Sequence, residues 1–375
     1  MSPTSRAFHF ISGLPRAGST LTAAILRQNP RFHAGMSSPV ASLFDGVIAQ
    51  VSAGSELSTM VNEAQRGRIL RGLFDSYYAD LDQPVIFDTN RAWTAKLPAL
   101  MRLFPEAKVI CCVRDVAWVM DSLERQYRNN AFEHTRLFNT PAERATVYTR
   151  VEALAHANRL VGFAWHALRE ACYSEFAERV LLLEYDLLAS RPADVFKLIY
   201  EFLGEAPFAH DFSKVEYDAP EFDAQLGMDG LHRVRAQVKP QSRKTILPPD
   251  LFTRYAQLSF WRDLKDSKAF RIVTQGSAEK QRETMPQPAQ AIAPETHDDH
   301  ARTGRSGSGT CPALSAGRWR RHRVAGRQRQ FRRRQTDRYV RRLPERAYDA
   351  LPRRRNRPAR RDSRIRNAAT ALRTP

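Results

Sequence analysis

Residues 7–28, AFHFISGLPRAGSTLTAAILRQ, give the strongest indication of the fold of the chain. Residues 7–12 form a short apolar run that is typical of a buried strand, and residues 19–28 form an apolar-periodic run of good helix formers. Between them lies a loop with two glycines, a proline and Arg16. A strand, a glycine loop and a helix in this order turn backbone N–H groups toward an anion at the helix N-terminus. The stretch therefore predicts an anion-binding loop.

The spacing within this loop narrows the prediction. Gly13 and Gly18 are separated by four residues and followed by Ser19 and Thr20, as in a phosphate loop. Ser19 stands where nucleotide hydrolases have the lysine that reaches the terminal phosphates, which argues against ordinary hydrolysis of ATP or GTP. The cation is instead Arg16, whose planar guanidinium matches phosphate or sulfate oxygens. The alternative is a plain tight turn that carries a solvated arginine.

Further short apolar runs predict strands at residues 84–89, 108–113 and 180–184. Strands that alternate with helices predict an α/β fold, in which a phosphate-loop-like parallel sheet is flanked by helices on both faces. Ligands of such sheets bind at the carboxyl ends of the strands. We therefore expect one site to contain the polar residues that follow the strand ends, which are Arg16, Asp88, Arg91, Arg114 and Tyr185.

The segments between the strands have helical periodicity or turn-like composition. We predict helices at residues 40–51, 57–74, 96–104, 117–128, 147–176 and 192–203, and a turn at 33–39. The variable segments at 35–80 and 128–150 are the expected walls of a second substrate pocket.

The net charge of +19 comes from the C-terminal part of the chain. Residues 301–375 hold 24 arginines, no lysine and four acids, a net charge of +20, so residues 1–300 carry a net charge of −1. We predict one phosphate-loop-like domain over 1–270, a linker over 271–300 and a disordered arginine-rich tail over 301–375. The tail is either a nucleic-acid-binding arm, an inert extension or an out-of-frame read of a GC-rich gene, because basic arms normally mix arginine with lysine.

Composition also bears on location. We find neither a signal peptide nor a run of about 20 apolar residues, so we expect a cytoplasmic protein without a membrane partner. The four cysteines fit no metal-ligand spacing and are expected to be reduced and buried. Two of them, Cys111 and Cys112, are adjacent in a predicted strand and should point to opposite faces.

A second polar constellation follows the third predicted strand. In VRDVAWVMDS, residues 113–122, Arg114 leaves the strand and Ser122 follows about two helical turns later. Both side chains could therefore face one ligand near the strand end. The alternative is that Asp115 caps the helix and Arg114 is solvated.

Together, GLPRAGSTL at 13–21 and VRDVAWVMDS at 113–122 resemble the two donor-binding segments of sulfotransferases that use 3′-phosphoadenosine 5′-phosphosulfate (PAPS), in their bacterial and tyrosylprotein-sulfotransferase-like branches. The resemblance implies transfer of a sulfuryl group from PAPS to a hydroxyl or amine acceptor, with release of PAP and without a metal. It implies that Arg114 and Ser122 bind the 3′-phosphate. The residues that it assigns to the 5′-phosphosulfate are Pro15, Arg16, Ala17, Gly18, Ser19 and Thr20.

Looser matches extend the resemblance over roughly residues 7–265. LEYD at 183–186 places Tyr185 near the donor nucleotide, and Lys239 falls on a donor-contacting lysine in a late loop. His232 stands in that loop where the family has a serine. Gln126, next to Arg125, stands where the tyrosylprotein branch has a further arginine.

The acceptor requires a general base. The branch has a glutamate after the first helix, but residues 36–39 of this chain contain no acid. Asp88 and His232 are the candidates, with Arg16 as the catalytic cation. Each candidate base also has a structural explanation, because a strand-end aspartate often caps a turn and a lone histidine is often structural.

Two other classes of protein remain open at this point. A phosphate-loop kinase of a small metabolite would bind ATP with magnesium. A nucleic-acid-binding protein would depend on its arginine tail, and truncation after residue 275 would abolish its function. The acceptor and the oligomeric state do not follow from the sequence.

Overall fold

The computed structural model describes residues 6–274, apart from 131, 133–134, 235–236 and 241–242. The described residues all belong to one compact unit. Most of the predicted linker and the whole predicted tail lie outside the described residues. The domain boundaries therefore stay a prediction.

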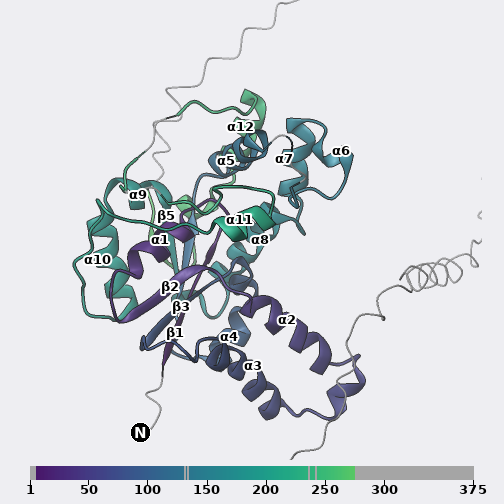
Figure 1. Cartoon of the computed structure of the whole chain (residues 1–375), viewed down its shortest axis with the longest axis vertical. Helices are drawn as coiled ribbons and strands as arrows, with labels where there is room; N and C mark the ends of the chain where they lie inside the picture. The colour runs from purple at the N-terminus through teal and green to yellow at the C-terminus, as the bar shows by residue number, and fades with distance from the viewer. Residues whose placement is uncertain (1–5, 131, 133–134, 235–236, 241–242, 275–375) are drawn as a thin grey trace, which may run out of the picture. The chain divides into compact units, whose positions relative to one another are not determined.

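Among the residues that the structure describes, six strands form one sheet in the order β2-β3-β1-β4-β5-β6, and every neighbouring pair is parallel (Figure 1). The predicted α/β fold with a parallel sheet is confirmed. The strands are β1 Ala7–Gly13, β2 Phe32–Ser37, β3 Val85–Thr89, β4 Val109–Val113, β5 Val180–Glu184 and β6 Phe270–Ile272.

Helices connect the strands and cover the sheet. The α-helices are α1 Ser19–Leu26, α2 Val40–Val51, α3 Glu63–Tyr77, α4 Leu97–Leu103, α5 Val116–Asn129, α6 Pro141–Arg144, α7 Val147–Ala155, α8 Leu160–Tyr173, α9 Tyr185–Ser190, α10 Pro192–Leu203, α11 Pro220–Gln225 and α12 Pro249–Ala256. The 3-10 helices are η1 Glu56–Thr59, η2 Arg91–Lys96, η3 Ala177–Arg179 and η4 Phe260–Asp263. Among the described residues, none of these helices has the length and apolar character that crossing a membrane requires.

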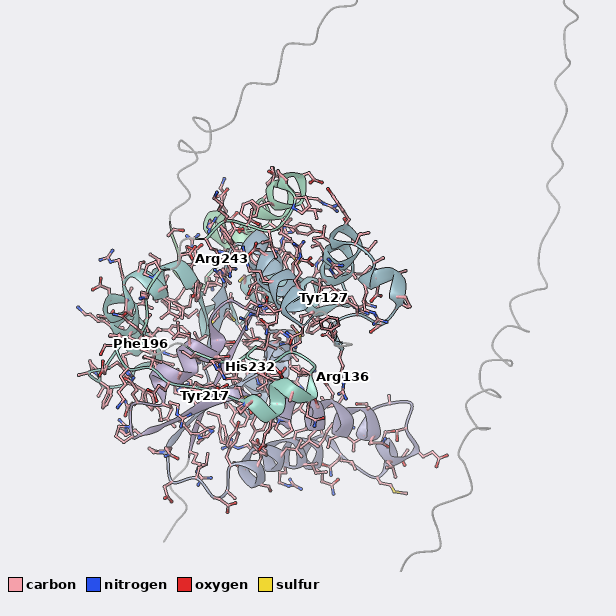
Figure 2. All side chains as sticks on the ribbon, turned by 45° about the horizontal axis from the view of Figure 1, so that its top comes forward. Tyr127, Arg136, Phe196, Tyr217, His232 and Arg243 are labelled. Atoms are coloured by element: carbon pink, nitrogen blue, oxygen red, sulfur yellow. The ribbon has the colours of Figure 1, made fainter. Side chains whose placement is uncertain are left out.

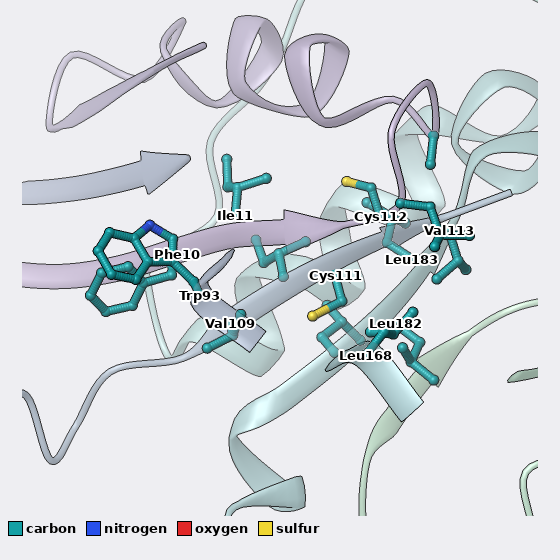
Figure 3. Close-up of a cluster of buried hydrophobic side chains, with 14 of the residues drawn as sticks. Phe10, Ile11, Trp93, Val109, Cys111, Cys112, Val113, Leu168, Leu182 and Leu183 are labelled. Atoms are coloured by element: carbon teal, nitrogen blue, oxygen red, sulfur yellow. The ribbon is translucent and has the colours of Figure 1, made fainter. Parts of the chain in front are cut away.

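Alternating side chains of the strands build a core on each face of the sheet. On one face, the ring of Phe10 lies 5.3 Å from that of Trp93 in η2 (Figure 3). It lies 5.9 Å from the ring of Phe74 in α3. On the other face, Phe32 stacks on Tyr200 of α10 at 5.7 Å. The expectation that helices flank both faces is therefore confirmed, with α10 on one side and α3 and α4 on the other (Figure 1).

The adjacent cysteines of β4 point to opposite faces, as predicted. Figure 3 shows Cys111 beside Leu168 of α8, and Cys112 on the other side of the strand. The Cys112 sulfur lies 3.5 Å from the hydroxyl of Thr22 in α1. Burial raises the pKa of the Cys112 thiol to about 12. Both cysteines are packing residues that stay in the thiol form at neutral pH.

The sequence pattern did not predict the strands at the two edges of the sheet, β2 and β6. The predicted turn at 33–39 is wrong: most of it belongs to β2, which pairs with β3 and has a register shift between Ala34 and Ser37. The glycine and serines of this segment lack strand periodicity. The segment becomes a strand because it pairs with β3, and Thr89 Oγ1 of β3 also donates a hydrogen bond to the Gly35 carbonyl at 2.8 Å. The three-residue strand β6 was not predicted, because so short a strand leaves no periodic pattern.

Two predicted helices are each divided. The predicted helix at 147–176 is wrong because the chain turns between α7 and α8. Gly162 permits this turn, since a Cβ there would lie 2.2 Å from the His156 carbonyl oxygen. The predicted helix at 57–74 is replaced by η1 and α3, because Asn62 and Gln65 form a capping box that starts α3 at Glu63.

Buried His9 makes folding stability sensitive to acid. Its Nδ1 accepts a hydrogen bond from the Lys108 backbone N–H at 3.1 Å, and burial followed by the Lys108 charge lowers its pKa to about 4. In the unfolded chain the pKa of histidine is about 6.5, so the unfolded state binds more protons between these values and stability falls as pH falls.

We expect the free energy of unfolding of the wild type to fall by about 2–3 kcal/mol more than that of His9→Gln between pH 7 and pH 4.5. Glutamine keeps an acceptor for the Lys108 N–H but does not titrate. Urea unfolding of both proteins across this pH range measures the difference. Parallel pH profiles for the two proteins would contradict the assignment.

Candidate functional site

The site lies at the crevice between the carboxyl ends of β1 and β4. In the strand order, the chain runs from β1 to β2 toward one edge of the sheet and from β4 to β5 toward the opposite edge. Ligands of open parallel sheets bind where the connections diverge in this way. A cavity of about 2310 Å³ opens here, lined by both strand ends and by segments from α5, α7 and residues 222–243.

Two glycines shape the loop that enters this crevice. Gly13 has φ +105°, and a Cβ there would lie 2.2 Å from the Cys112 carbonyl oxygen of β4. Gly18 has φ +98° and caps α1, and a Cβ there would lie 2.9 Å from the ring of Tyr185. The two glycines therefore meet two requirements. Gly13 lets β1 approach β4 closely, and Gly18 adopts the left-handed backbone that begins α1.

Arg16 projects from the middle of the loop with a left-handed backbone, φ 59°. Its Nε donates to Ser122 Oγ at 3.1 Å, and its Nη1 donates to the Leu231 carbonyl. Burial, then the neighbouring charge of Arg114, lowers its pKa to about 10, so it stays cationic at neutral pH. A non-glycine residue in this backbone region is strained, which indicates a functional reason for placing the guanidinium here.

Arg114 lies beside Arg16 at the end of β4. Its guanidinium stacks over the Tyr185 ring at 4.4 Å, and its Nη1 lies 3.5 Å from the Arg16 carbonyl oxygen. Tyr185 is thereby held between Gly18 and Arg114. The Arg114 Nε is buried and has no hydrogen-bond partner among the described residues.

Arg243 is a third cation of the site, and the sequence analysis did not identify it. Burial lowers its pKa, Asp121 raises it, and Arg114 lowers it. Its Nη2 lies 2.9 Å from Asp121 Oδ2. This ion pair lacks hydrogen-bond geometry, and the Arg243 Nε is likewise buried without a partner among residues 6–274 as described. The only sequence signal was a basic pair, Arg243-Lys244, in a loop without periodicity.

The structure gathers nearly all of the sequence-predicted donor residues around one cavity. The predicted residues that line it are Pro15, Arg16, Gly18, Ser19, Thr20, Arg114, Ser122, Tyr185 and Lys239. Ala17 does not line the cavity, because its side chain is buried in the core. Gln126 and Arg125 both line it, but Gln126 donates to the Asp229 carbonyl at 2.7 Å and Arg125 donates to Asp121 at 2.9 Å.

Asp88 is not brought to the cavity. Its carboxyl group is fully buried and accepts hydrogen bonds from Ser38 and Tyr78 at 2.6 Å each and from Trp93 at 2.7 Å. Burial raises its pKa, against the opposing effect of these three donors. We assign it to packing the face of the sheet under α3 and η2. Its neighbour Arg91 does line the cavity.

His232 lines the cavity and has a carboxylate partner. Its Nδ1 lies 2.5 Å from Oδ1 of Asp223, which is fully buried, and its backbone N–H donates to Asp223 Oδ2 at 2.9 Å. In Figure 2, His232 lies beside helix α11, which carries Asp223. A histidine whose Nδ1–H donates to a carboxylate presents the lone pair of Nε2, which is the tautomer of a general base.

Comparisons with known proteins agree with a site that binds an anionic ligand. The sequence profile of the sulfotransferase family matches residues 9–209, more than half of the chain. The chain therefore belongs to the sulfotransferase family, whose reaction is sulfuryl transfer. This match gives no support to the kinase alternative. It ends before His232 and Arg243, so their assignment depends on geometry.

Several solved sulfotransferase structures are similar to this chain. STF9 from Mycobacterium avium is 15% identical with a TM-score of 0.36, over 56% of this chain and 66% of STF9, just under two thirds of its length. The sulfotransferase domain of the Synechococcus PCC 7002 olefin synthase is 15% identical with a TM-score of 0.41, over 68% of this chain and 96% of that domain. A sulfotransferase from Alicyclobacillus acidocaldarius is 17% identical with a TM-score of 0.38, over 59% and 89%. No curated protein matches the chain in sequence.

Proposed function

We propose that the protein transfers a sulfuryl group from PAPS to a hydroxyl or amine acceptor and releases PAP. The observation that supports this most directly is the pair of buried N–H donors, Arg114 Nε and Arg243 Nε, that have no partner among the described residues. A buried donor without an acceptor costs about 1–3 kcal/mol. Two such donors on adjacent guanidinium groups favour an anionic ligand with several oxygens.

The loop and the arginines would bind different groups of the donor. The backbone of the loop, the hydroxyls of Ser19 and Thr20, and Arg16 lie at the N-terminus of α1 and suit the 5′-phosphosulfate. Arg114 and Arg243, together with Ser122 and Lys239, suit the 3′-phosphate, whose presence would distinguish PAPS from ATP. Ala17 would contribute through its backbone, because its side chain lies in the core.

Bound PAPS would supply an activated sulfuryl group, and the protein would supply orientation, charge and a base. Negative charge spreads over the equatorial oxygens during in-line transfer, and the Arg16 guanidinium is placed to stabilise it. His232 Nε2 would accept the proton of the acceptor, while Asp223 holds the imidazole in the required tautomer. We propose His232 as the base in preference to Asp88, which lies outside the cavity. This scheme requires no metal.

We propose that residues 1–270 contain the complete activity, and that the protein acts in the cytoplasm. Binding of nucleic acid by the arginine-rich residues 301–375 stays a prediction that lies outside the described residues. Donor binding by a chain truncated after residue 275 would support this division of roles, and loss of donor binding would contradict it.

Calorimetric titration of the full chain tests the proposed donor. In the presence of EDTA, we expect PAP to bind and ATP to bind more weakly, because ATP lacks the 3′-phosphate. Magnesium-dependent binding of ATP, with no binding of PAP, would overturn the proposal and return the protein to the kinase class.

Arg114→Ala should weaken PAP binding about 10–100-fold, because it removes a charge-assisted contact to the 3′-phosphate. The affinity for AMP, which lacks that phosphate, should change less than threefold. Titrations of wild type and variant with both nucleotides measure the two effects. An equal loss for PAP and AMP would place Arg114 elsewhere on the donor.

A further inference from the structure

Asp121 of α5 is a fully buried carboxylate that divides its two oxygens between a chain segment and two cations. Oδ1 accepts hydrogen bonds from Thr245 Oγ1 at 3.0 Å and from the Ile246 backbone N–H at 2.7 Å. Oδ2 accepts one from Arg125 Nε at 2.9 Å and lies 2.9 Å from Arg243 Nη2. One side chain therefore ties the segment that carries Arg243 to α5.

This tie lies directly against the proposed donor site. Ser122, the next residue of α5, binds Arg16, and the Arg243 guanidinium lies over the Trp118 ring of the same helix at 5.5 Å. Figure 2 shows Arg243 near α5. Arg114 and Arg125 both repel the charge of Arg243, as the lowering of its pKa by these two groups indicates. Asp121 supplies the attraction that opposes this repulsion.

We propose that Asp121 is a positioning residue of the donor site, which holds Arg243 where it can bind the 3′-phosphate of the donor. The inference rests on the proposed function, since it concerns the same nucleotide. The positioning role and a simple effect of charge predict changes of opposite sign in PAP affinity. Removing a negative charge near an anionic ligand should strengthen binding of PAP, whereas releasing Arg243 should weaken it.

Asp121→Asn separates these effects. The amide oxygen can still accept from Ile246 and Thr245, but the amide nitrogen then faces the arginines and holds neither. We expect PAP affinity to fall about tenfold, with AMP affinity unchanged within threefold. Arg243→Ala should give the same pattern, and the double variant should bind PAP no more weakly than Arg243→Ala alone, because both changes remove one interaction.

Glu124→Gln is the matched control. Glu124 lies on the same helix, is buried, and also binds two arginines, Arg128 and Arg150, but it is not among the residues that line the cavity. Its replacement should lower thermal stability without altering the ratio of PAP to AMP affinity. Thr245→Val serves if Asp121→Asn fails to fold. It removes one hydroxyl, which donates to Asp121 and accepts from the Leu247 backbone N–H, and it should lower the ratio by about twofold to fivefold.

Titration of the full-length variants with PAP and AMP decides the question. Unchanged or tighter PAP binding by Asp121→Asn, an equal loss for PAP and AMP, or an unchanged ratio in Thr245→Val would each overturn the positioning role. Failure of the wild type to bind PAP would instead overturn the proposed function itself.

Discussion

Replacing Arg16 with alanine is expected to lower the rate of sulfuryl transfer from PAPS by about 10²–10³-fold. Arg16 is the one cation within the loop at the N-terminus of α1, and its pKa of about 10 keeps it charged at neutral pH. Its strained backbone holds the guanidinium at the carboxyl end of β1, where the transferred group would carry its developing charge. The release of PAP from PAPS, with water as the acceptor, measures this rate without knowledge of the natural acceptor.

Arg16→Lys and Arg233→Ala make this test specific. Lysine keeps the charge but cannot reproduce the planar fork that reaches Ser122 and Leu231, so we expect only partial recovery of the rate. Arg233 also lines the cavity, but it is exposed and paired with Asp218, so its loss should change the rate less than threefold. Comparable losses in Arg16→Ala and Arg233→Ala would show that general positive charge, rather than Arg16, supports transfer.

Most of the proposed donor-binding residues could be expected from the sequence to lie around one cavity, because they follow a local rule. Arg114 directly follows the buried strand β4, and Arg16 lies in the loop that follows the buried strand β1. Parallel strands bring their carboxyl ends to one edge of the sheet. Gly13 and Gly18 carry the backbone requirements of the loop in their spacing. The same rule misplaced Asp88, which lies within β3, one residue before its end. Its side chain points to the face covered by Tyr78 and Trp93, and a short apolar run gives no indication of which face a helix will close.

The rest of the site depends on contacts between segments that are distant in the sequence. Arg243 reaches the donor cavity through Asp121, which precedes it by more than a hundred residues and has no distinguishing pattern on its helix. Asp223 becomes the partner of His232 because the backbone turns between them after α11. Neither pairing has a periodic or spacing signal. The sequence indicated His232 as a candidate base, but Asp223, Asp121 and Arg243 were identified only from the folded chain.

Replacing His232 with alanine is expected to lower the rate of transfer from PAPS by about 10²–10⁴-fold while changing PAP affinity less than threefold. The Nδ1–H of the imidazole is held by Asp223, which leaves Nε2 as the nitrogen that accepts the proton of the acceptor. A base acts on the reacting proton and contributes little to ground-state binding of the donor, so the two measurements should separate. PAP release from PAPS gives the rate, and calorimetry with PAP gives the affinity.

Two further variants identify the dyad as the source of this effect. Asp223→Asn should lower the rate less than His232→Ala does, because the imidazole remains but its tautomer is no longer fixed. His156 is a matched control, since it also lines the cavity but pairs with Asn158 instead of a carboxylate, and His156→Ala should keep the rate within threefold. A full rate in His232→Ala would exclude this residue as the base. A loss of PAP binding that parallels the loss of rate would instead show that His232 holds the segment over the donor, as Leu231 does through its contact with Arg16.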